Sequence, residues 1–558
     1  MRSKSFHMPY SITAEVKKES CLRPKKQAAK ARFFLYAILT VGISFRLFHF
    51  IHNRSLWLDE IYVSLNVISA DFQQLTSPLL EYQQKAPIGF LWMVKCSVLL
   101  FGNQEQALRL IPFLCGIAAL ICFIPVCRYW LKPAGQMAAI GMMAFAPPLI
   151  YHSVEVKQYS MELLATVLCL WLYIRFYDKR DLKSRLLWGT SGALILWFSY
   201  SSVFILTGIG AAVCLSLIAN KDWKSLWKMS VPFSMWFSSF AIHYALITSK
   251  QVDQQWLLYW FRHYNSFMPL PLWSADTAKW LVQHLYTMLD YPLGLLWNFN
   301  TADSTVLRII MKMSFIPIIL TLAGAYAFLK TDKRALVLLI MPLLLTLAAS
   351  GAERYPFFER LLVFLSPLII LFIARGCDQA IKSLPVLRSS QFIIPALLFI
   401  GGFSASAANV VDPGDFGRYK KSYQKEALLY IDKNYREGDL VYLYWNMDYG
   451  YRYYKKAYNL RYNAIEGSDM KFASANPEDY MNKLERDLIL LKGKRRVWVV
   501  YNKKLWNDIG EIESKPNWYN KSEPGEFLYD ELSHRALEKE SFKLDEVNVH
   551  LFDFSAAP

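Results

Sequence analysis

Long apolar blocks alternate with short polar segments along most of the chain. Representative blocks are Phe33–Phe48, Ala107–Val126, Met229–Ile247, Ile309–Leu329 and Ile393–Ala408. Each approaches or reaches the roughly 20 residues that a helix needs to cross about 30 Å of hydrocarbon. The pattern therefore predicts an all-α polytopic membrane domain over residues 33–411.

One apolar block, Ala86–Phe101, disturbs the charge pattern of the loops that follow it. Hydropathy gives twelve candidate spans, but if this block crosses the membrane, basic loops such as 128–136 and 178–186 lie outside. If it lies in the interface or re-enters the membrane from the same side, the remaining Lys/Arg loops all become cytoplasmic, as the positive-inside rule requires. We therefore predict eleven spans. The predicted outer loops are 52–106, 152–159, 250–305 and 350–360.

Charge sets the expected orientation. The net charge is +17, and residues 1–32 hold seven more Lys/Arg than Glu directly before the first span. The basic residues sit in short clusters between apolar blocks, which excludes a nucleic-acid partner and fits a multi-pass protein of the plasma (inner) membrane. We expect residues 1–32 to be a cytoplasmic tail and the chain beyond the last span to be extracytoplasmic.

The composition becomes that of a soluble domain after Asp412. Tyr419–Arg436 and Pro477–Leu491 have helical patterns, whereas Leu440–Tyr444 and Arg495–Tyr501 read as strands. Residues 412–558 are therefore predicted to form an extracytoplasmic α/β domain. Its aromatic stretch 449–454 could stack on sugar rings, but a packed helix face is the favoured interpretation.

Asp59 and Glu60 follow the first span at its outer end. A carboxylate at the rim of a membrane cavity can accept a proton from a hydroxyl or amine nucleophile. The alternative is an acidic pair that stabilises the start of a helix by its charge. We name both as candidate catalytic residues.

A second polar patch, His152–Ser160, lies between two predicted spans on the same face. Lys157 could hold a lipid-linked phosphate, and sugar hydroxyls could contact Glu155, Gln158 and Tyr159. A solvated turn with a chance Glu/Lys pair is the alternative.

Three further basic residues could neutralise a phosphate leaving group. Arg354 and Arg360 lie in a third outer loop, and Lys85 precedes the Ala86 block. Interfacial anchoring would explain them as well. The histidines His263 and His284 leave a divalent metal possible as a cofactor, but no paired spacing supports a metal site.

Taken together, several short motifs resemble the bacterial protein-mannosyltransferase and aminoarabinose-transferase type of GT-C membrane glycosyltransferases. They are Trp57-Leu58-Asp59-Glu60, Lys85-Ala86-Pro87-Ile88-Gly89, Phe101-Gly102, Ala107-Leu108-Arg109-Leu110, Glu155-Val156-Lys157-Gln158-Tyr159-Ser160 and Arg354-Tyr355 through Arg360-Leu361. The resemblance covers about residues 33–410.

The resemblance implies a role for several of these residues. The acidic residue of the family's first outer loop is the catalytic base, which maps to Asp59 with Glu60 beside it. The donor-contacting motif maps to Glu155, Lys157 and Tyr159, and the basic residue before the first-loop helix maps to Lys85. The family also keeps an interfacial segment in its first outer loop.

The expected activity is an inverting transfer of a sugar from a polyprenyl-phosphate donor on the outer face of the membrane. The acceptor stays open among glycolipid, glycan and protein, and membrane lipids are further expected partners. A flippase of lipid-linked sugars would also need many spans and a polar outer cavity. A GT-C-like polymerase or ligase and a non-catalytic scaffold are also consistent with these features.

Overall fold

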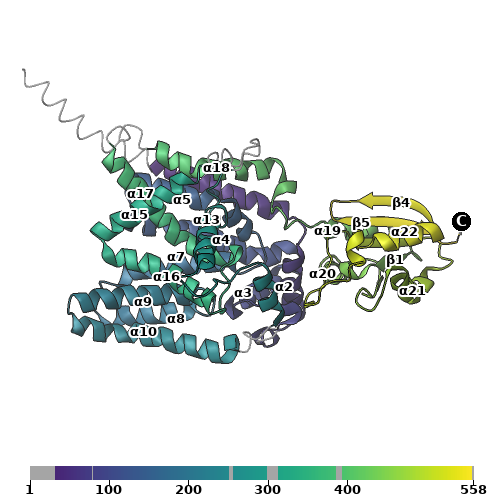
Figure 1. Cartoon of the computed structure of the whole chain (residues 1–558), viewed down its shortest axis with the longest axis horizontal. Coiled ribbons are helices and arrows are strands. Elements are labelled where there is room, and N and C mark those ends of the chain that lie inside the picture. Colours follow the sequence, from purple (N-terminus) through teal and green to yellow (C-terminus); the bar gives the residue numbers. More distant parts are fainter. Residues whose placement is uncertain (1–31, 78–79, 250–254, 298–311, 385–391, 556–558) are drawn as a thin grey trace, which may run out of the picture.

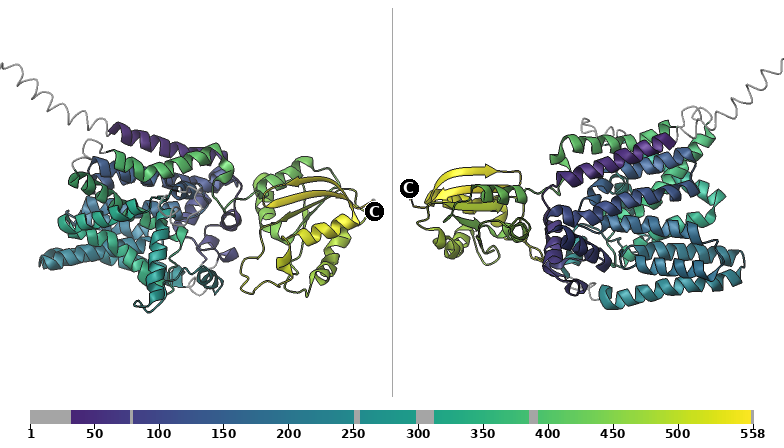
Figure 2. Two further views of the ribbon diagram at one scale, coloured as in Figure 1. Left: turned by 45° about the horizontal axis from the view of Figure 1, so that its top comes forward. Right: turned by 180° about the vertical axis from the view of Figure 1, so that it is seen from behind.

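The computed structural model describes residues 32–77, 80–249, 255–297, 312–384 and 392–555. A helical bundle carries an α/β domain at one end (Figure 1). The two parts lie end to end in every view (Figure 2). Nearly all of the predicted basic tail, residues 1–31, and part of the predicted loop 250–305 lie outside the described residues.

The bundle begins with the N-terminal helix Arg32–His52. The helices that follow are α2 (Leu58–Ser69), α3 (Ile88–Phe101), α4 (Glu105–Trp130), α5 (Pro133–Phe145), α6 (Pro147–Ser153), α7 (Tyr159–Phe176), α8 (Leu182–Ile195), α9 (Ser202–Ala219), α10 (Trp223–His243), α12 (Gln255–His263), α13 (Ala275–Asp290), α15 (Phe315–Thr331), α16 (Lys333–Gly351), α17 (Ser366–Ser383) and α18 (Ile393–Val411). The 3₁₀ helix η4 (Glu359–Leu365) leads directly into α17.

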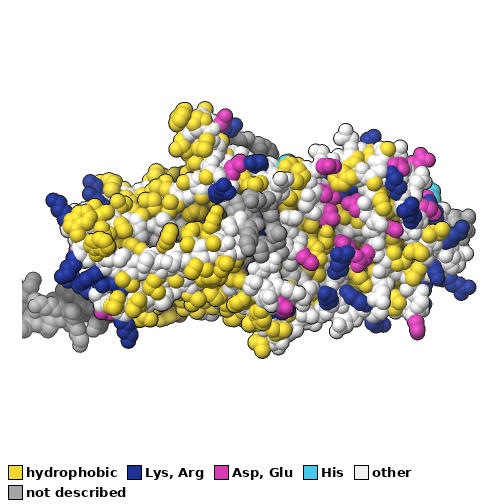
Figure 3. All heavy atoms as spheres, turned by 90° about the horizontal axis from the view of Figure 1, so that it is seen from below, with side chains coloured by type: hydrophobic (Ala, Val, Ile, Leu, Met, Phe, Trp, Pro, Cys, Tyr) yellow, Lys and Arg dark blue, Asp and Glu magenta, His cyan; other side chains and the backbone are white. Residues whose placement is uncertain are grey.

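Seven of the described helices are long and apolar enough to cross a membrane. The predicted polytopic all-α region is confirmed, while the count of eleven spans stays a prediction. Helix α3 has 14 residues, which is about 21 Å of helix and too short to cross the hydrocarbon. Hydrophobic side chains cover the bundle surface, and Lys and Arg gather at the end farthest from the α/β domain (Figure 3).

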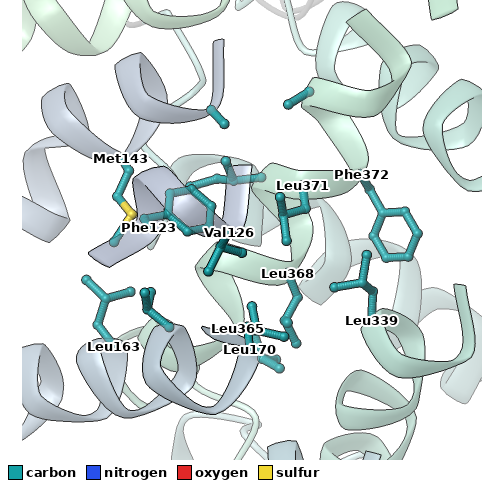
Figure 4. Packing of buried hydrophobic residues seen from close by; sticks show 14 of the residues in the cluster. Phe123, Val126, Met143, Leu163, Leu170, Leu339, Leu365, Leu368, Leu371 and Phe372 are labelled. Atoms are coloured by element: carbon teal, nitrogen blue, oxygen red, sulfur yellow. The ribbon is translucent and has the colours of Figure 1, made fainter. Parts of the chain in front are cut away.

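The bundle core is apolar and continuous across helices that are far apart in sequence. Phe123, Met143, Leu170 and Leu371 come from α4, α5, α7 and α17, and they pack in one cluster (Figure 4). Helices α15 and α17 cross closely because each has a glycine at the contact, Gly324 on α15 and Gly376 on α17. A Cβ at Gly324 would lie 1.9 Å from the Phe372 carbonyl oxygen. Small residues permit this backbone approach in membrane bundles.

The C-terminal domain contains a five-stranded sheet of order β2-β1-β3-β5-β4. The strands are β1 (Leu440–Leu443), β2 (Ala464–Glu466), β3 (Val497–Asn502), β4 (Leu537–Lys543) and β5 (Val547–Asp553), and the helices are α19 (Gln424–Asn434), α20 (Asp448–Tyr458), α21 (Pro477–Leu488) and α22 (Glu526–Arg535). Strands β2, β1 and β3 are parallel, and β5 is antiparallel to both β3 and β4. The predicted α/β class is confirmed.

Helix α20 holds the C-terminal domain against the bundle. Four of its five tyrosines are buried, as the packed-face interpretation predicted, and Tyr458 is half-buried. The hydroxyl of Tyr454 accepts a hydrogen bond from the Leu56 N–H at 2.8 Å, and the hydroxyl of Tyr458 donates to Glu105 at 2.6 Å. The C-terminal domain is thereby attached to the segment that leads into α2, immediately before Asp59.

Candidate active site

A cavity of about 1280 Å³ lies between the C-terminal domain and the end of the bundle that adjoins it. Its walls come from the start of α2, from α9, α10 and α12, from the turn before η4, and from residues 504–520 of the C-terminal domain. Seven of the nine candidate residues line it: Asp59, Lys85, Lys157, Gln158, Tyr159, Arg354 and Arg360. Glu60 and Glu155 lie behind this lining.

Asp59 stands in the first turn of α2, where the helix begins after extended backbone at Trp57. Its Oδ2 lies 2.5 Å from Nη1 of Arg360, and a quarter of its side chain is exposed. Burial raises the pKa of the Asp59 carboxyl, but Arg360 and Lys157 outweigh that effect, so the pKa ends below its usual value. Asp59 is therefore an ionised carboxylate on the cavity wall.

Glu60 has a different environment from its neighbour. It is fully buried and accepts two hydrogen bonds from Arg109, at 3.0 Å each, and one from Arg54 at 2.8 Å. The N–H groups of Trp57 and Val156 also donate to it. The bond from Trp57 is the one expected of a glutamate at the third helical position. This geometry supports a positioning role for Glu60, which ties α2 to α4 and to the 154–158 turn.

Glu155 ends a buried chain of hydrogen bonds behind the cavity. It accepts from Trp57 Nε1 at 3.2 Å and from His152 Nδ1 at 2.6 Å. The other ring nitrogen of His152 accepts from the Tyr291 hydroxyl, which itself accepts from Lys420 Nζ at 3.2 Å. Burial lowers the pKa of His152 to about 4, so the ring is neutral at pH 7 and can hold both bonds at once.

The motif predicted to contact the sugar donor brings three side chains to the cavity. Lys157 donates to Gln84 Oε1 at 2.7 Å, and burial lowers the pKa of its ammonium. Gln158 is 7% exposed, and its Oε1 has no hydrogen-bond partner within the described residues. The Tyr159 ring packs edge-on against the His152 ring at 4.8 Å. A buried acceptor without a partner is costly unless a ligand satisfies it.

The predicted basic residues occupy distinct places. The Arg360 guanidinium lies between the rings of Trp57 and Trp260, at 5.7 and 5.8 Å from their centroids. Arg354 reaches the cavity from an exposed turn, and Lys85 reaches it from the half-buried segment before α3. Arg360 is thus the cation that the fold sets directly beside Asp59.

Two buried cations of this site, Arg109 and Lys420, were not identified from the sequence. Arg109 belongs to a quoted motif, but its pairing with Glu60 spans 49 positions and leaves no local pattern. Lys420 follows the last span, is 2% exposed, and lies 5.7 Å from the centroid of the Trp57 ring. A lone lysine in a polar segment carries no signal of such burial.

Of the two histidines that left a metal possible, His284 packs against a neighbouring ring, whereas His263 is exposed and lines the cavity. His284 stacks on Trp280 at 3.9 Å and bonds to its carbonyl oxygen. His263 lies on α12 beside the Tyr264 ring. Within the described residues, no group of three or more His, Cys, Asp or Glu side chains could hold a metal ion.

Comparison with known proteins gives a consistent picture. The family model described as dolichyl-phosphate-mannose-protein mannosyltransferase matches residues 85–247. No curated protein matches the sequence. The structure of ArnT from Cupriavidus metallidurans in the apo state has a TM-score of 0.51 at 11% identity, over 95% of this chain and 99% of that chain.

Two further solved structures score slightly lower. ArnT from Cupriavidus metallidurans bound to undecaprenyl phosphate has a TM-score of 0.49 at 11% identity, covering 94% of this chain and 98% of that one. The apo oligosaccharyltransferase of Archaeoglobus fulgidus has a TM-score of 0.48 at 12% identity, covering 84% and 70%. The fold shared with apo ArnT and the matching family model together confirm that the chain resembles the protein-mannosyltransferase and aminoarabinose-transferase type of GT-C membrane glycosyltransferases.

Proposed function

We propose that the protein is a GT-C glycosyltransferase that moves a sugar from a polyprenyl-phosphate donor to an acceptor on the outer face of the membrane. The observation that carries this is the pairing, on one cavity wall, of the ionised Asp59 with the cations Arg360 and Lys157. The matching family is named for dolichyl-phosphate-mannose, which is a sugar linked through phosphate to a polyprenyl-type lipid. The acceptor is proposed to be a glycolipid, glycan or protein.

The proposed reaction is a single inverting displacement. An acceptor hydroxyl or amine attacks the anomeric carbon as its proton passes to the Asp59 carboxylate. The bond between that carbon and the phosphate oxygen breaks, and polyprenyl phosphate leaves with the electron pair. Charge therefore develops on the departing phosphate, where preorganised cations such as Arg360, Lys157, Lys85 and Arg354 stabilise it.

Because of the contact between Arg360 and Asp59, the basicity of Asp59 in this mechanism depends on whether the donor is bound. Before the donor arrives, Arg360 holds the pKa of Asp59 down, which makes the carboxylate a weak base. A bound phosphate shares the guanidinium, so the pKa of Asp59 rises toward the ordinary range of a carboxyl group. Donor binding would thereby make Asp59 a better base only when a leaving group is in place.

The test follows free polyprenyl phosphate from the purified chain in nanodiscs. Each member of a panel of polyprenyl-phosphate sugars is supplied together with membrane-extract acceptors. We expect release from at least one donor, coupled to loss of the sugar-lipid. If no donor is consumed while sugar-lipid crosses the bilayer of reconstituted vesicles, the protein is a flippase and the proposal is wrong.

Lys420 gives a prediction for the alkaline side of the pH profile. Burial lowers the pKa of its ammonium to about 8, against the attraction of Glu155. Its positive charge is therefore present below pH 8 and is lost as the pH rises through that value. Without that charge the hydrogen-bond chain through Tyr291 and His152 no longer ends in a charged donor, and we expect turnover to fall roughly tenfold.

The matched variants are Lys420→Arg and Lys420→Met. Arginine keeps its charge, so the alkaline fall should move to higher pH, whereas methionine should give the low turnover at every pH. A wild-type profile that stays flat from pH 7 to 9.5 would contradict this role.

A further inference from the structure

The sheet of the C-terminal domain has a topological switch point, which is a place where α/β proteins commonly bind ligands. The chain leaves β1 for β2 on one side and then reaches β3 on the other, so β1 and β3 flank a point where the strand order reverses. In open sheets of this type, ligands bind outside the carboxyl ends of such strands. Here Asn446 bridges the two strand ends through bonds of 2.7 and 2.9 Å to Asn502.

The residues that follow β3, from Lys504 through Ile509, line the cavity, and so do Glu511, Lys515 and Asn520 beyond them. A buried ion pair between Lys471 and Glu511, at 2.5 Å, fixes this segment to the domain. One wall of the cavity is therefore built by the C-terminal domain.

This wall meets the bundle one helical turn from Asp59. Tyr62 is three positions further along α2, so both side chains share a face of the helix, and both line the cavity. The Tyr62 ring contacts the Tyr449 ring at 5.0 Å, and the Tyr449 hydroxyl donates to Asp508 at 2.7 Å. The hydroxyl of Tyr62 is buried and has no hydrogen-bond partner within the described residues.

We propose that this wall is the acceptor site and that it binds a saccharide. The inference rests on the proposed transferase function, since it places the acceptor beside the base of that reaction. Around Trp506, the segment offers the side chains of Asn507, Asn517 and Asn520. Amide groups carry both donors and acceptors, as sugar hydroxyls do, and an aromatic ring supplies a flat apolar face.

The geometry favours a saccharide over an extended peptide. Peptides in an extended conformation commonly pair with an exposed strand at the edge of a sheet. The edge strands of this sheet are β2 and β4, whereas the cavity is lined by the turns beyond β3. Among the residues that the structure describes, the cavity lining offers side chains and no free strand edge.

The test measures binding alone, so its result does not depend on the transfer reaction. Saturation-transfer NMR is recorded on the full chain in nanodiscs with three soluble probes in turn, which are maltotriose, chitotriose and mannotriose. A Ser/Thr-rich peptide is the fourth probe. We expect a saturation-transfer signal from at least one saccharide. Its Kd should be roughly three- to tenfold weaker in Asn507→Ala and in Trp506→Leu.

Two variants make the result specific. Asp530→Asn changes an exposed residue of α22 away from the cavity and should bind like the wild type. Asn507 is exposed, so its replacement leaves the fold intact even if Trp506→Leu does not fold. The proposed acceptor site would be wrong if only the peptide gave a saturation-transfer signal or if no probe gave one. It would also be wrong if Asn507→Ala bound the saccharide as tightly as the wild type. The donor-release assay would fail separately if the transferase function were wrong.

Discussion

Asp59→Asn is expected to lower kcat by about 10²–10⁴-fold, the usual loss when a positioned general base is removed. The amide keeps the shape of the side chain but cannot accept the acceptor's proton. Donor affinity should be kept or slightly increased, because Arg360 loses its carboxylate partner at 2.5 Å and becomes free for phosphate. The measurement is turnover of the best donor together with its Kd in nanodiscs.

The control for this variant is Glu81→Gln, which removes an exposed charge from the segment between α2 and α3, outside the cavity lining. It should retain wild-type turnover. Equal kcat in Asp59→Asn and wild type would remove Asp59 from the mechanism. A loss of donor affinity at constant kcat would assign Asp59 to binding.

Glu60→Gln is expected to destabilise the fold by about 3–5 kcal/mol, the typical cost of breaking a buried ion pair on one side. The change leaves the guanidinium groups of Arg54 and Arg109 without their shared carboxylate. Thermal unfolding in detergent should show a clearly lower Tm. Glu466→Gln, which removes the exposed partner of Arg452, should change the stability by less than about 1 kcal/mol.

The pH dependence of Glu60 follows from the same contacts. Burial raises the pKa of its carboxyl, but Arg109 and Arg54 outweigh burial, so the pKa in the folded state lies below the usual value. A depressed carboxyl pKa contributes stability above the unfolded pKa, and that contribution is lost as the pH falls through the folded pKa. Wild type should thus lose Tm in acid more steeply than Glu60→Gln, and parallel curves would contradict the assignment.

The two neighbouring carboxylates show what sequence reasoning can and cannot reach. Their position at a helix start after the first apolar helix was predictable, and so was the short apolar helix α3, because both depend on local pattern; the interfacial placement of α3 stays a prediction. The sequence did not show which of the two carboxylates, Asp59 or Glu60, faces the cavity. That depends on Arg109 and Arg360, which are 49 and 301 positions away from their partners.

The C-terminal domain shows the same division. The patterns of α19, α21, β1 and β3 were evident in the sequence, since each has a regular apolar period. Helix α20 was anticipated only as a packed aromatic face. The pairing of β5 with β3 and the approach of residues 504–520 to the cavity depend on tertiary contacts, which no local pattern records.

The shared cavity also has a consequence for biosynthesis. A ribosome makes the bundle helices first, and α2 with Asp59 is finished long before residues 504–520 exist. Strand β5, which supports β3 and so the segment beyond it, is made later still. An unfinished chain therefore carries its carboxylate in an open groove with one wall missing. Completion of β5, rather than completion of α18, is therefore the step that completes the wall of this cavity.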